Sequence, residues 1–135
     1  MASRRTACVT GAGGFLGWHL VADLKRRGYY VVGVDVKMPE FEATRADEFV
    51  LADLLEEVAA VEYVKGHEVY ALAADMGGMG YLATNGGKML RENLRVNLNT
   101  LDAARANGVE RVVFASSACV YNEAHQTADD AGPLT

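Results

Sequence analysis

Three glycines, Gly11, Gly14 and Gly17, follow a short apolar run and stand three residues apart. In a dinucleotide site the first permits a tight turn, the second lets the backbone approach a pyrophosphate, and the third lets a helix pack closely on its strand. The phosphate charge would lie on the free N–H groups at the helix N-terminus, where the helix dipole is positive. A tight turn without a ligand can have the same spacing, but the strand before it and the helix after it favour nucleotide binding.

Asp35 is a second candidate, because it ends an aromatic and β-branched run eighteen residues after Gly17. A carboxylate at that position accepts hydrogen bonds from both hydroxyls of an adenosine ribose and repels a 2′-phosphate. Asp35 therefore favours NAD over NADP, although Lys37 would offset part of the repulsion. The alternative is an acidic residue that only caps the turn after the strand.

Two more candidates follow later apolar runs. Asp53 comes after the run 48–51 and is either the N-cap of a helix or a contact to the adenine amino group. The segment 73–80 combines small residues with three glycines. It either leaves room for a cofactor at the end of a strand or forms a flexible connection.

Ser117 and Cys119 follow the last apolar run of the chain. A hydroxyl at the end of a strand can bond a reacting oxygen, and a thiol can exchange a proton with a carbon acid. The sequence offers no companion base to activate Cys119, so a purely structural cysteine is the alternative.

The elements that must position these residues alternate between strand and helix, with Gly28 and Gly108 closing two of the helices. The pattern predicts an α/β fold with a Rossmann-type doubly wound parallel sheet in the strand order 3-2-1-4-5. The fifth strand would leave an unpaired edge, so we expect the chain to self-associate. The predicted strands are 6–10, 29–34, 48–51, 67–73 and 111–116, and the predicted helices are 14–27, 53–64 and 85–107.

Leucines recur at helical spacing in two of these helices. Such stripes usually pack in the core. The helix 85–107 is long enough that part of its stripe would also face a partner subunit, which makes a homo-oligomer the expected state. The stripes are Leu16, Leu20 and Leu24 in the helix 14–27 and Leu90, Leu94, Leu98 and Leu101 in the helix 85–107.

Composition excludes several classes of protein. The chain has 135 residues, half of them apolar, and a net charge of −5, without the basic stripe of a nucleic-acid-binding protein. No apolar run approaches the length of a membrane span, and no signal peptide precedes the first strand. The two cysteines are far apart, as expected for free thiols in the cytoplasm.

The segment from Thr10 to Gly17 resembles the TGxxGxxG signature of the extended short-chain dehydrogenases/reductases. The segments 73–80 and 115–121 resemble the branch of that family that epimerises GDP-mannose. The resemblance covers the chain from Thr6 to Tyr121. It implies a bound NAD that takes a hydride from C4 of a nucleotide sugar and returns it after epimerisation at the carbons that the 4-keto group acidifies.

Matched by position, the resemblance also assigns residues to two sets of contacts and no residue to a metal. The contacts to NAD fall on Gly11, Gly14, Phe15, Leu16, Asp35, Asp53, Leu54, Leu72, Ala73, Ala74 and Asn93. The contacts to a GDP-mannose-like sugar fall on Gly77, Ser117, Ala118 and Cys119, with Cys119 in the acid/base pair and Ser117 as donor to the C4 oxygen.

The chain also departs from the family pattern. Tyr121 is followed by Asn-Glu-Ala-His, so it forms no YxxxK motif, and the family's tyrosine and lysines lie beyond this stretch. We therefore expect residues 1–135 to be a partial NAD-binding Rossmann domain without the substrate domain. Three functions stay open: part of a GDP-mannose-type epimerase, part of another NAD-dependent sugar epimerase or dehydratase, and a non-catalytic NAD-binding module.

Overall fold

The computed structural model of the chain describes residues 4–117 and residue 120. Its elements alternate as predicted, and five strands form one sheet. In chain order they are β1 (Thr6–Thr10), α1 (Phe15–Arg26), β2 (Tyr30–Asp35), β3 (Glu48–Leu51), α2 (Glu57–Tyr63), β4 (Glu68–Ala71), α3 (Met79–Ala106) and β5 (Arg111–Phe114).

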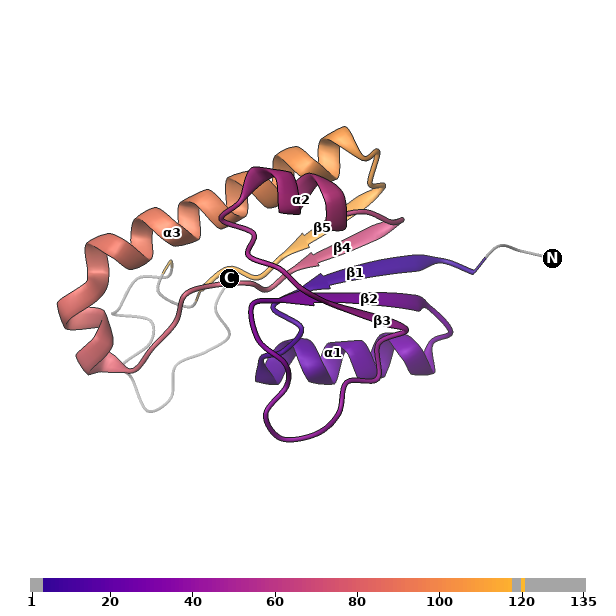
Figure 1. Ribbon diagram of the computed structural model, residues 1–135, viewed down its shortest axis with the longest axis horizontal. Helices are drawn as coiled ribbons and strands as arrows, with labels where there is room; N and C mark the ends of the chain where they lie inside the picture. The colour runs from indigo at the N-terminus through magenta and orange to yellow at the C-terminus, as the bar shows by residue number, and fades with distance from the viewer. Residues whose placement is uncertain (1–3, 118–119, 121–135) are drawn as a thin grey trace, which may run out of the picture.

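The sheet has the order β3-β2-β1-β4-β5, and every neighbouring pair is parallel. Helix α1 covers one face, and α2 and α3 lie together on the other (Figure 1). The predicted Rossmann-type fold and strand order are therefore confirmed. Within the described residues β5 pairs only with β4, and Val113 and Phe114 on it are 41% and 51% exposed.

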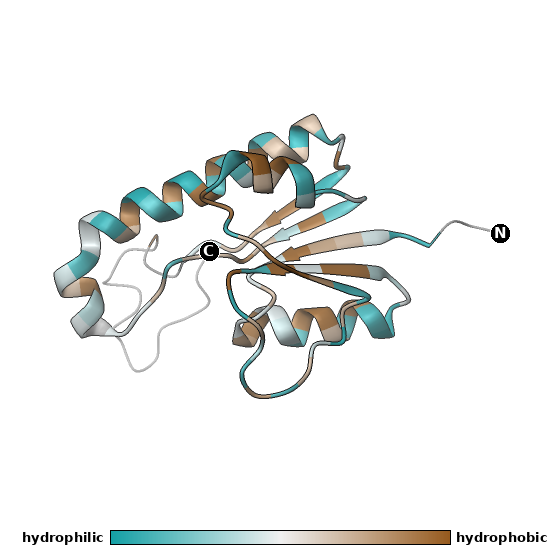
Figure 2. Cartoon of the chain, in the orientation of Figure 1, coloured by the Kyte–Doolittle hydropathy of each residue, from teal (hydrophilic) through white to brown (hydrophobic). Residues whose placement is uncertain are grey.

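Strand β1 lies at the centre, and its side chains alternate between two apolar cores. Cys8 packs with Val34, Leu54 and Val69 beneath α2 and α3. Val9 lies in the other core with residues of α1 and β2. Burial of both faces explains why the central strands are almost continuously apolar, as their hydropathy shows in Figure 2.

The buried face of α1 differs from the predicted leucine stripe. Leu24 is buried and Leu20 packs partly buried against the core, both as expected, but Leu16 is 67% exposed. Trp18 and Val21 are buried in its place, and the buried Gly17 lies against Gly11 and Ala12 of the turn that follows β1. Because α1 comes closest to the turn at Gly17, the buried face of the helix is centred on the side of Gly17, and Leu16 faces away from it.

Helix α3 corrects two expectations. It begins at Met79, six residues before the predicted start, and the exposed glycines Gly80, Gly86 and Gly87 all lie inside it. Its core face consists of Met89, Thr100, Ala103 and Ala104, whereas the predicted core stripe of Leu90, Leu94, Leu98 and Leu101 is 47–64% exposed. The small buried residues let α3 approach α2 and the sheet closely, which turns the leucines outward.

No helix in the described part of the chain combines the length and apolarity that crossing a membrane requires.

A polar network closes the amino end of the sheet. The Glu68 carboxylate, only 3% exposed, accepts hydrogen bonds from the hydroxyls of Tyr70 (2.8 Å) and Tyr29 (3.2 Å) and pairs with Arg5 (3.3 Å). The hydrogen bond from Tyr70 lowers the pKa of Glu68, and burial raises the pKa of Tyr70 to about 12. This network lies at the amino ends of the strands, whereas open α/β sheets bind ligands at the carboxyl ends.

Candidate functional site

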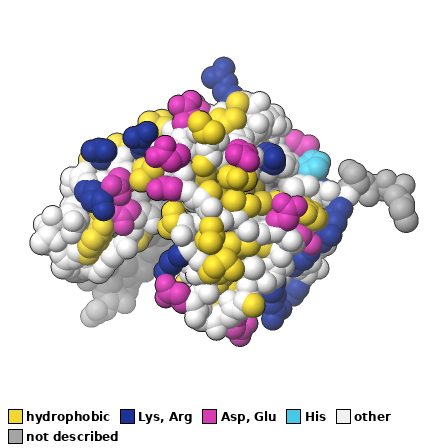
Figure 3. Space-filling model, in the orientation of Figure 1, with side chains coloured by type: hydrophobic (Ala, Val, Ile, Leu, Met, Phe, Trp, Pro, Cys, Tyr) yellow, Lys and Arg dark blue, Asp and Glu magenta, His cyan; other side chains and the backbone are white. Residues whose placement is uncertain are grey.

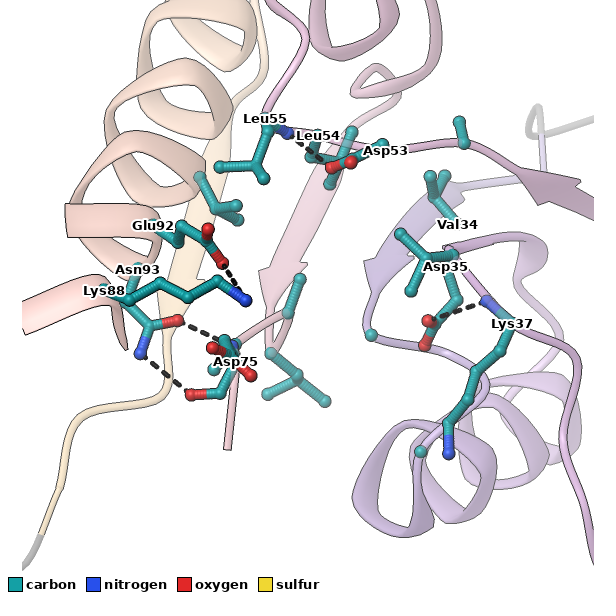
Figure 4. A pocket seen from close by; sticks show the side chains of 18 residues that line it. Val34, Asp35, Lys37, Asp53, Leu54, Leu55, Asp75, Lys88, Glu92 and Asn93 are labelled. Carbon is teal, nitrogen blue, oxygen red and sulfur yellow. Dashed lines mark hydrogen bonds and ion pairs between the residues drawn. The ribbon is translucent and has the colours of Figure 1, made fainter. Parts of the chain in front are cut away.

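A cavity of about 400 Å³ opens at the carboxyl ends of β1, β2 and β4, between the glycine-rich turn and α3. In Figure 4, Lys88, Glu92 and Asn93 of α3 lie across the cavity from Asp35 and Lys37. The structure brings nine of the eleven residues predicted to contact the cofactor to its lining: Gly11, Gly14, Asp35, Asp53, Leu54, Leu72, Ala73, Ala74 and Asn93.

The turn from β1 to α1 depends on two glycines. Gly11 has a φ of +71°, which L side chains rarely adopt. A Cβ on Gly17 would lie 2.1 Å from the carbonyl oxygen of Gly11, so only glycine lets α1 pack this closely on the turn. The tasks predicted for these two positions are confirmed.

Gly14 has a different role, because the fold itself does not require a glycine there. Its φ of −80° and ψ of 172° suit any residue. A Cβ would meet only the Gly11 carbonyl oxygen, at 3.4 Å. Since Gly14 lines the cavity, a side chain would instead occupy space beside the first N–H groups of α1. Those groups have no partner within the helix, and its first turn has no acidic residue, so the open space suits a phosphate.

Asp35 is fixed at the rim of the cavity by backbone donors. One carboxylate oxygen accepts the N–H of Gly13 at 2.8 Å, and the other accepts that of Lys37 at 3.2 Å. The ammonium of Lys37 bonds Glu40 at 2.7 Å. Gly13 was not singled out in the sequence, although a Cβ there would lie 2.2 Å from the Lys37 carbonyl oxygen. Gly13, the fourth glycine of the turn, therefore lets the β2–β3 connection pack against the turn, and its N–H group orients the Asp35 carboxylate.

Asp53 is not the N-cap of α2, which begins only at Glu57 after Glu56. The carboxylate of Asp53 accepts the N–H of Leu55 at 2.9 Å, and its carbonyl accepts the N–H of Glu56 at 3.1 Å. This local turn delays the helix by four residues and leaves Asp53 and the buried Leu54 facing the cavity.

Thr10 positions the wall formed by the end of β4. Its buried hydroxyl accepts the N–H groups of both Leu72 and Ala73 at 3.2 Å. These bonds draw the two residues out of the ladder, which explains why β4 ends at Ala71 rather than at the predicted Ala73. Sequence reasoning assigned Thr10 no role beyond the motif, because its contact depends on a strand sixty residues away.

Three charged residues of the cavity were also missed: Asp75, Lys88 and Glu92. Lys88 and Glu92 form an ion pair across one turn of α3, with nitrogen and oxygen 3.8 Å apart. With Asp35, Asp53 and Lys37, the lining carries four acidic and two basic side chains. A diphosphate in this cavity would therefore depend on the N-terminus of α1 rather than on cations.

The remaining predicted residues lie elsewhere or outside the described chain. Phe15 and Leu16, the first two residues of α1, have side chains that are 68% and 67% exposed and do not line the cavity. Gly77 and Ser117 are exposed and do not line the cavity, and Ala118 and Cys119 lie outside the described residues.

The thiol and metal chemistry of the described residues is limited. Cys8 is fully buried, and burial raises the pKa of its thiol to about 12, so it is unreactive. The residues that the structure describes contain no group of three or more side chains that would hold a metal ion.

Fold and site together define a Rossmann-type dinucleotide-binding unit. The NAD dependent epimerase/dehydratase family matches residues 7–135, and the chain belongs to that family. NAD is the cofactor of the family, and the open helix N-terminus, Gly14 and Asp35 fit its diphosphate and ribose.

The curated relatives of the chain include two kinds of nucleotide-sugar epimerase. The chain is 41% identical over 121 residues to GDP-mannose 3,5-epimerase of Arabidopsis thaliana, covering 87% of this chain and 32% of the relative. It is 33% identical over 143 residues to UDP-glucose 4-epimerase of Mus musculus, covering 93% and 41%. The chain thus spans about a third of the length of the curated GDP-mannose 3,5-epimerases it matches.

Solved structures of nucleotide-sugar epimerases also resemble the chain. A UDP-galactose 4-epimerase structure matches 88% of this chain and 40% of its own, with a TM-score of 0.77 and 34% identity. UDP-glucose 4-epimerase from Brucella ovis in complex with NAD gives a TM-score of 0.76 at 29% identity, covering 87% and 37%.

Gly14 and Gly17 make a matched pair for testing the site. Gly14→Ala should weaken NAD binding about tenfold or more, because the methyl group narrows the approach to the α1 N-terminus, and should leave thermal unfolding nearly unchanged. Gly17→Ala should destabilise the fold by roughly 1–3 kcal/mol, because the helix must move away from the turn. Calorimetric titration and thermal unfolding followed by circular dichroism measure both effects. Unchanged NAD affinity in folded Gly14→Ala would show that the diphosphate does not bind at this turn.

Proposed function

We propose that this chain is the NAD-binding part of a nucleotide-sugar epimerase, and that its substrate class is that of the GDP-mannose 3,5-epimerases. The observation that carries the proposal is the gathering of nine predicted cofactor residues around one cavity. The preference for GDP-mannose rests on the identity of 41% to the Arabidopsis enzyme, against 33% to the mouse UDP-glucose 4-epimerase.

A UDP-sugar epimerase is the second candidate, because similar structures contain such substrates. One of them, MoeE5 in complex with UDP-glucose and NAD, is 34% identical to this chain with a TM-score of 0.73. The segments 73–80 and 115–121, which resemble the GDP-mannose branch, favour the first candidate.

NAD, when bound, supplies the acceptor and donor of the hydride exchanged with C4 of the sugar. The Asp35 carboxylate would accept hydrogen bonds from the adenosine ribose, and the first N–H groups of α1 would hold the diphosphate. We propose that the Ser117 hydroxyl donates a hydrogen bond to the C4 oxygen and that the Cys119 thiol exchanges a proton with a neighbouring carbon.

The distribution of these groups predicts that the 135-residue chain does not exchange protons on GDP-mannose. The tyrosine and lysines that the family uses in hydride and proton transfer have no counterpart in this stretch, and each general acid–base step contributes about 10²–10⁴-fold. The assay is deuterium incorporation into GDP-mannose in D₂O with saturating NAD, followed by mass spectrometry. Substantial incorporation by the chain alone would contradict the proposed division of catalytic groups.

A fusion supplies the missing groups and tests the substrate class. Residues 1–121 joined to the remaining two-thirds of the Arabidopsis relative should incorporate deuterium into GDP-mannose but not into UDP-glucose. Cys119→Ala in that fusion should abolish incorporation and leave NAD affinity within about twofold. Exchange that survives Cys119→Ala, or that is as fast on UDP-glucose, would refute the assignment.

We also propose that the exposed leucines of α3 join two copies of the chain. Leu90, Leu94, Leu98 and Leu101 recur every three or four residues on one side of a 28-residue helix. Figure 3 shows apolar side chains between charged ones over this helix. An apolar stripe of this length is self-complementary in an antiparallel helix pair, which a two-fold dimer would bury.

Leu94→Lys tests this interface against Val58→Lys, a change of an equally apolar residue that is 78% exposed on α2. Sedimentation velocity should show a dimer for the unaltered chain and for Val58→Lys. For Leu94→Lys the dimer dissociation constant should rise at least about tenfold, because a charge would be buried at the centre of the stripe. A dimer that Leu94→Lys leaves intact would instead favour pairing through the edge of β5.

A further inference from the structure

Tyr81, in the first turn of α3, makes contacts that no part of the proposed chemistry uses. Its hydroxyl donates to the carboxylate of Asp75, with distances of 3.0 Å to Oδ2 and 3.3 Å to Oδ1. Asp75 lines the cavity, in the segment 72–78 that connects β4 to α3. The hydrogen bond to Asp75 also raises the pKa of Tyr81, which keeps the phenol protonated as the donor.

The backbone of Asp75 is held independently by Asn93, which lies further along the same helix than Tyr81. The Asp75 N–H donates to the Asn93 side-chain oxygen at 2.6 Å, and the Asn93 amide donates back to the Asp75 carbonyl at 3.0 Å (Figure 4). Because the Thr10 hydroxyl also accepts the N–H groups of Leu72 and Ala73, the start and the middle of the segment are both bonded to regular elements.

The ring of Tyr81 explains one glycine of the run that follows. A Cβ on Gly77 would lie 2.5–2.8 Å from Tyr81 side-chain carbons, so the ring lies directly on the Gly77 backbone. Gly78 and Gly80 have nothing within 4 Å of a built Cβ. Tyr81 is therefore in contact with both the cavity wall at Asp75 and the residue predicted to meet the sugar.

We propose that Tyr81 is a positioning residue that, through Asp75 and Gly77, holds the segment 72–78 in the conformation that receives the cofactor beyond its adenosine diphosphate half. A segment this rich in glycine has many conformations when free, and ordering it on binding reduces affinity. The contacts of Tyr81 remove that cost before the ligand arrives. This inference rests on the proposed function, because it takes NAD as the ligand of the cavity.

The experiment compares the affinities of the 135-residue chain for NAD and for ADP by calorimetry. Tyr81→Phe should weaken NAD binding roughly tenfold, the effect of losing one hydrogen bond to a charged group. ADP affinity should change less than about twofold, because the groups that would hold ADP (Asp35, Asp53, Leu54 and the turn at Gly14) lie outside the segment 72–78. Tyr29→Phe is the matched control: it also removes a hydroxyl that bonds a carboxylate, but at the opposite end of the sheet, and should change neither affinity.

Two further readouts separate positioning from a loss of folding. In the ligand-free chain, Tyr81→Phe should accelerate hydrogen exchange at the Asp75 amide while leaving the central strand residue Val9 protected. Asp75→Asn keeps an oxygen that accepts the Tyr81 hydroxyl, and it should retain most of the NAD affinity.

Three results would overturn the inference. Tyr81→Phe that binds NAD normally, or that weakens NAD and ADP equally, would show that Tyr81 does not act on the segment 72–78. If the unaltered chain binds neither ligand, the proposed function fails and this inference fails with it.

Discussion

The carbonyl oxygen of Gly11 lies where a side chain at position 17 would have to be, with only 2.1 Å between it and a built Cβ. This contact sets how closely α1 packs on the end of β1, and the rest of the site depends on that distance. It places the helix N-terminus at the carboxyl edge of the sheet, where Gly14 leaves space in front of it. The residues at the ends of β2 and β4 then face the same space.

Side-chain bonds between neighbouring strand ends keep that edge in register. Asp35 at the end of β2 is tied to the turn through the N–H of Gly13, and Thr10 at the end of β1 is tied to Leu72 and Ala73 after β4. The strands that these bonds connect, β1 with β2 and β1 with β4, are also neighbours in the sheet. The cavity is therefore a property of the sheet edge as a unit, and its acidic lining leaves the backbone of α1 as the partner for an anion.

Much of this arrangement could be predicted from the sequence because it depends on local signals. Glycine spacing, strand ends and alternating elements predicted the sheet order, the turn and the place of Asp35. The face that each helix buries was predicted less well, because periodicity shows that an apolar stripe exists and not what it packs against. In α3 two stripes compete, and the smaller residues Ala103 and Ala104 allow the closer packing.

Contacts that leave no pattern in the sequence could not be predicted, whether the partners are near or far apart along the chain. Asp53 has the residue type of an N-cap, but the hydrogen bond that it makes to Leu55 forms a separate turn instead. Gly13 and Tyr81 have tasks only because Lys37 and Gly77 come to lie against them in the folded chain. No periodicity or local motif marks such pairs, whereas the shared motif of a family marks the positions that contact a ligand.

The central claim is that the glycine turn and Asp35 form a site for NAD, and the most direct measurement is a parallel calorimetric titration of the unaltered chain with NAD and NADP. NAD should bind at least about tenfold more tightly, because a 2′-phosphate would lie against the Asp35 carboxylate while Lys37 is engaged by Glu40. Equal affinities, or tighter binding of NADP, would contradict the account.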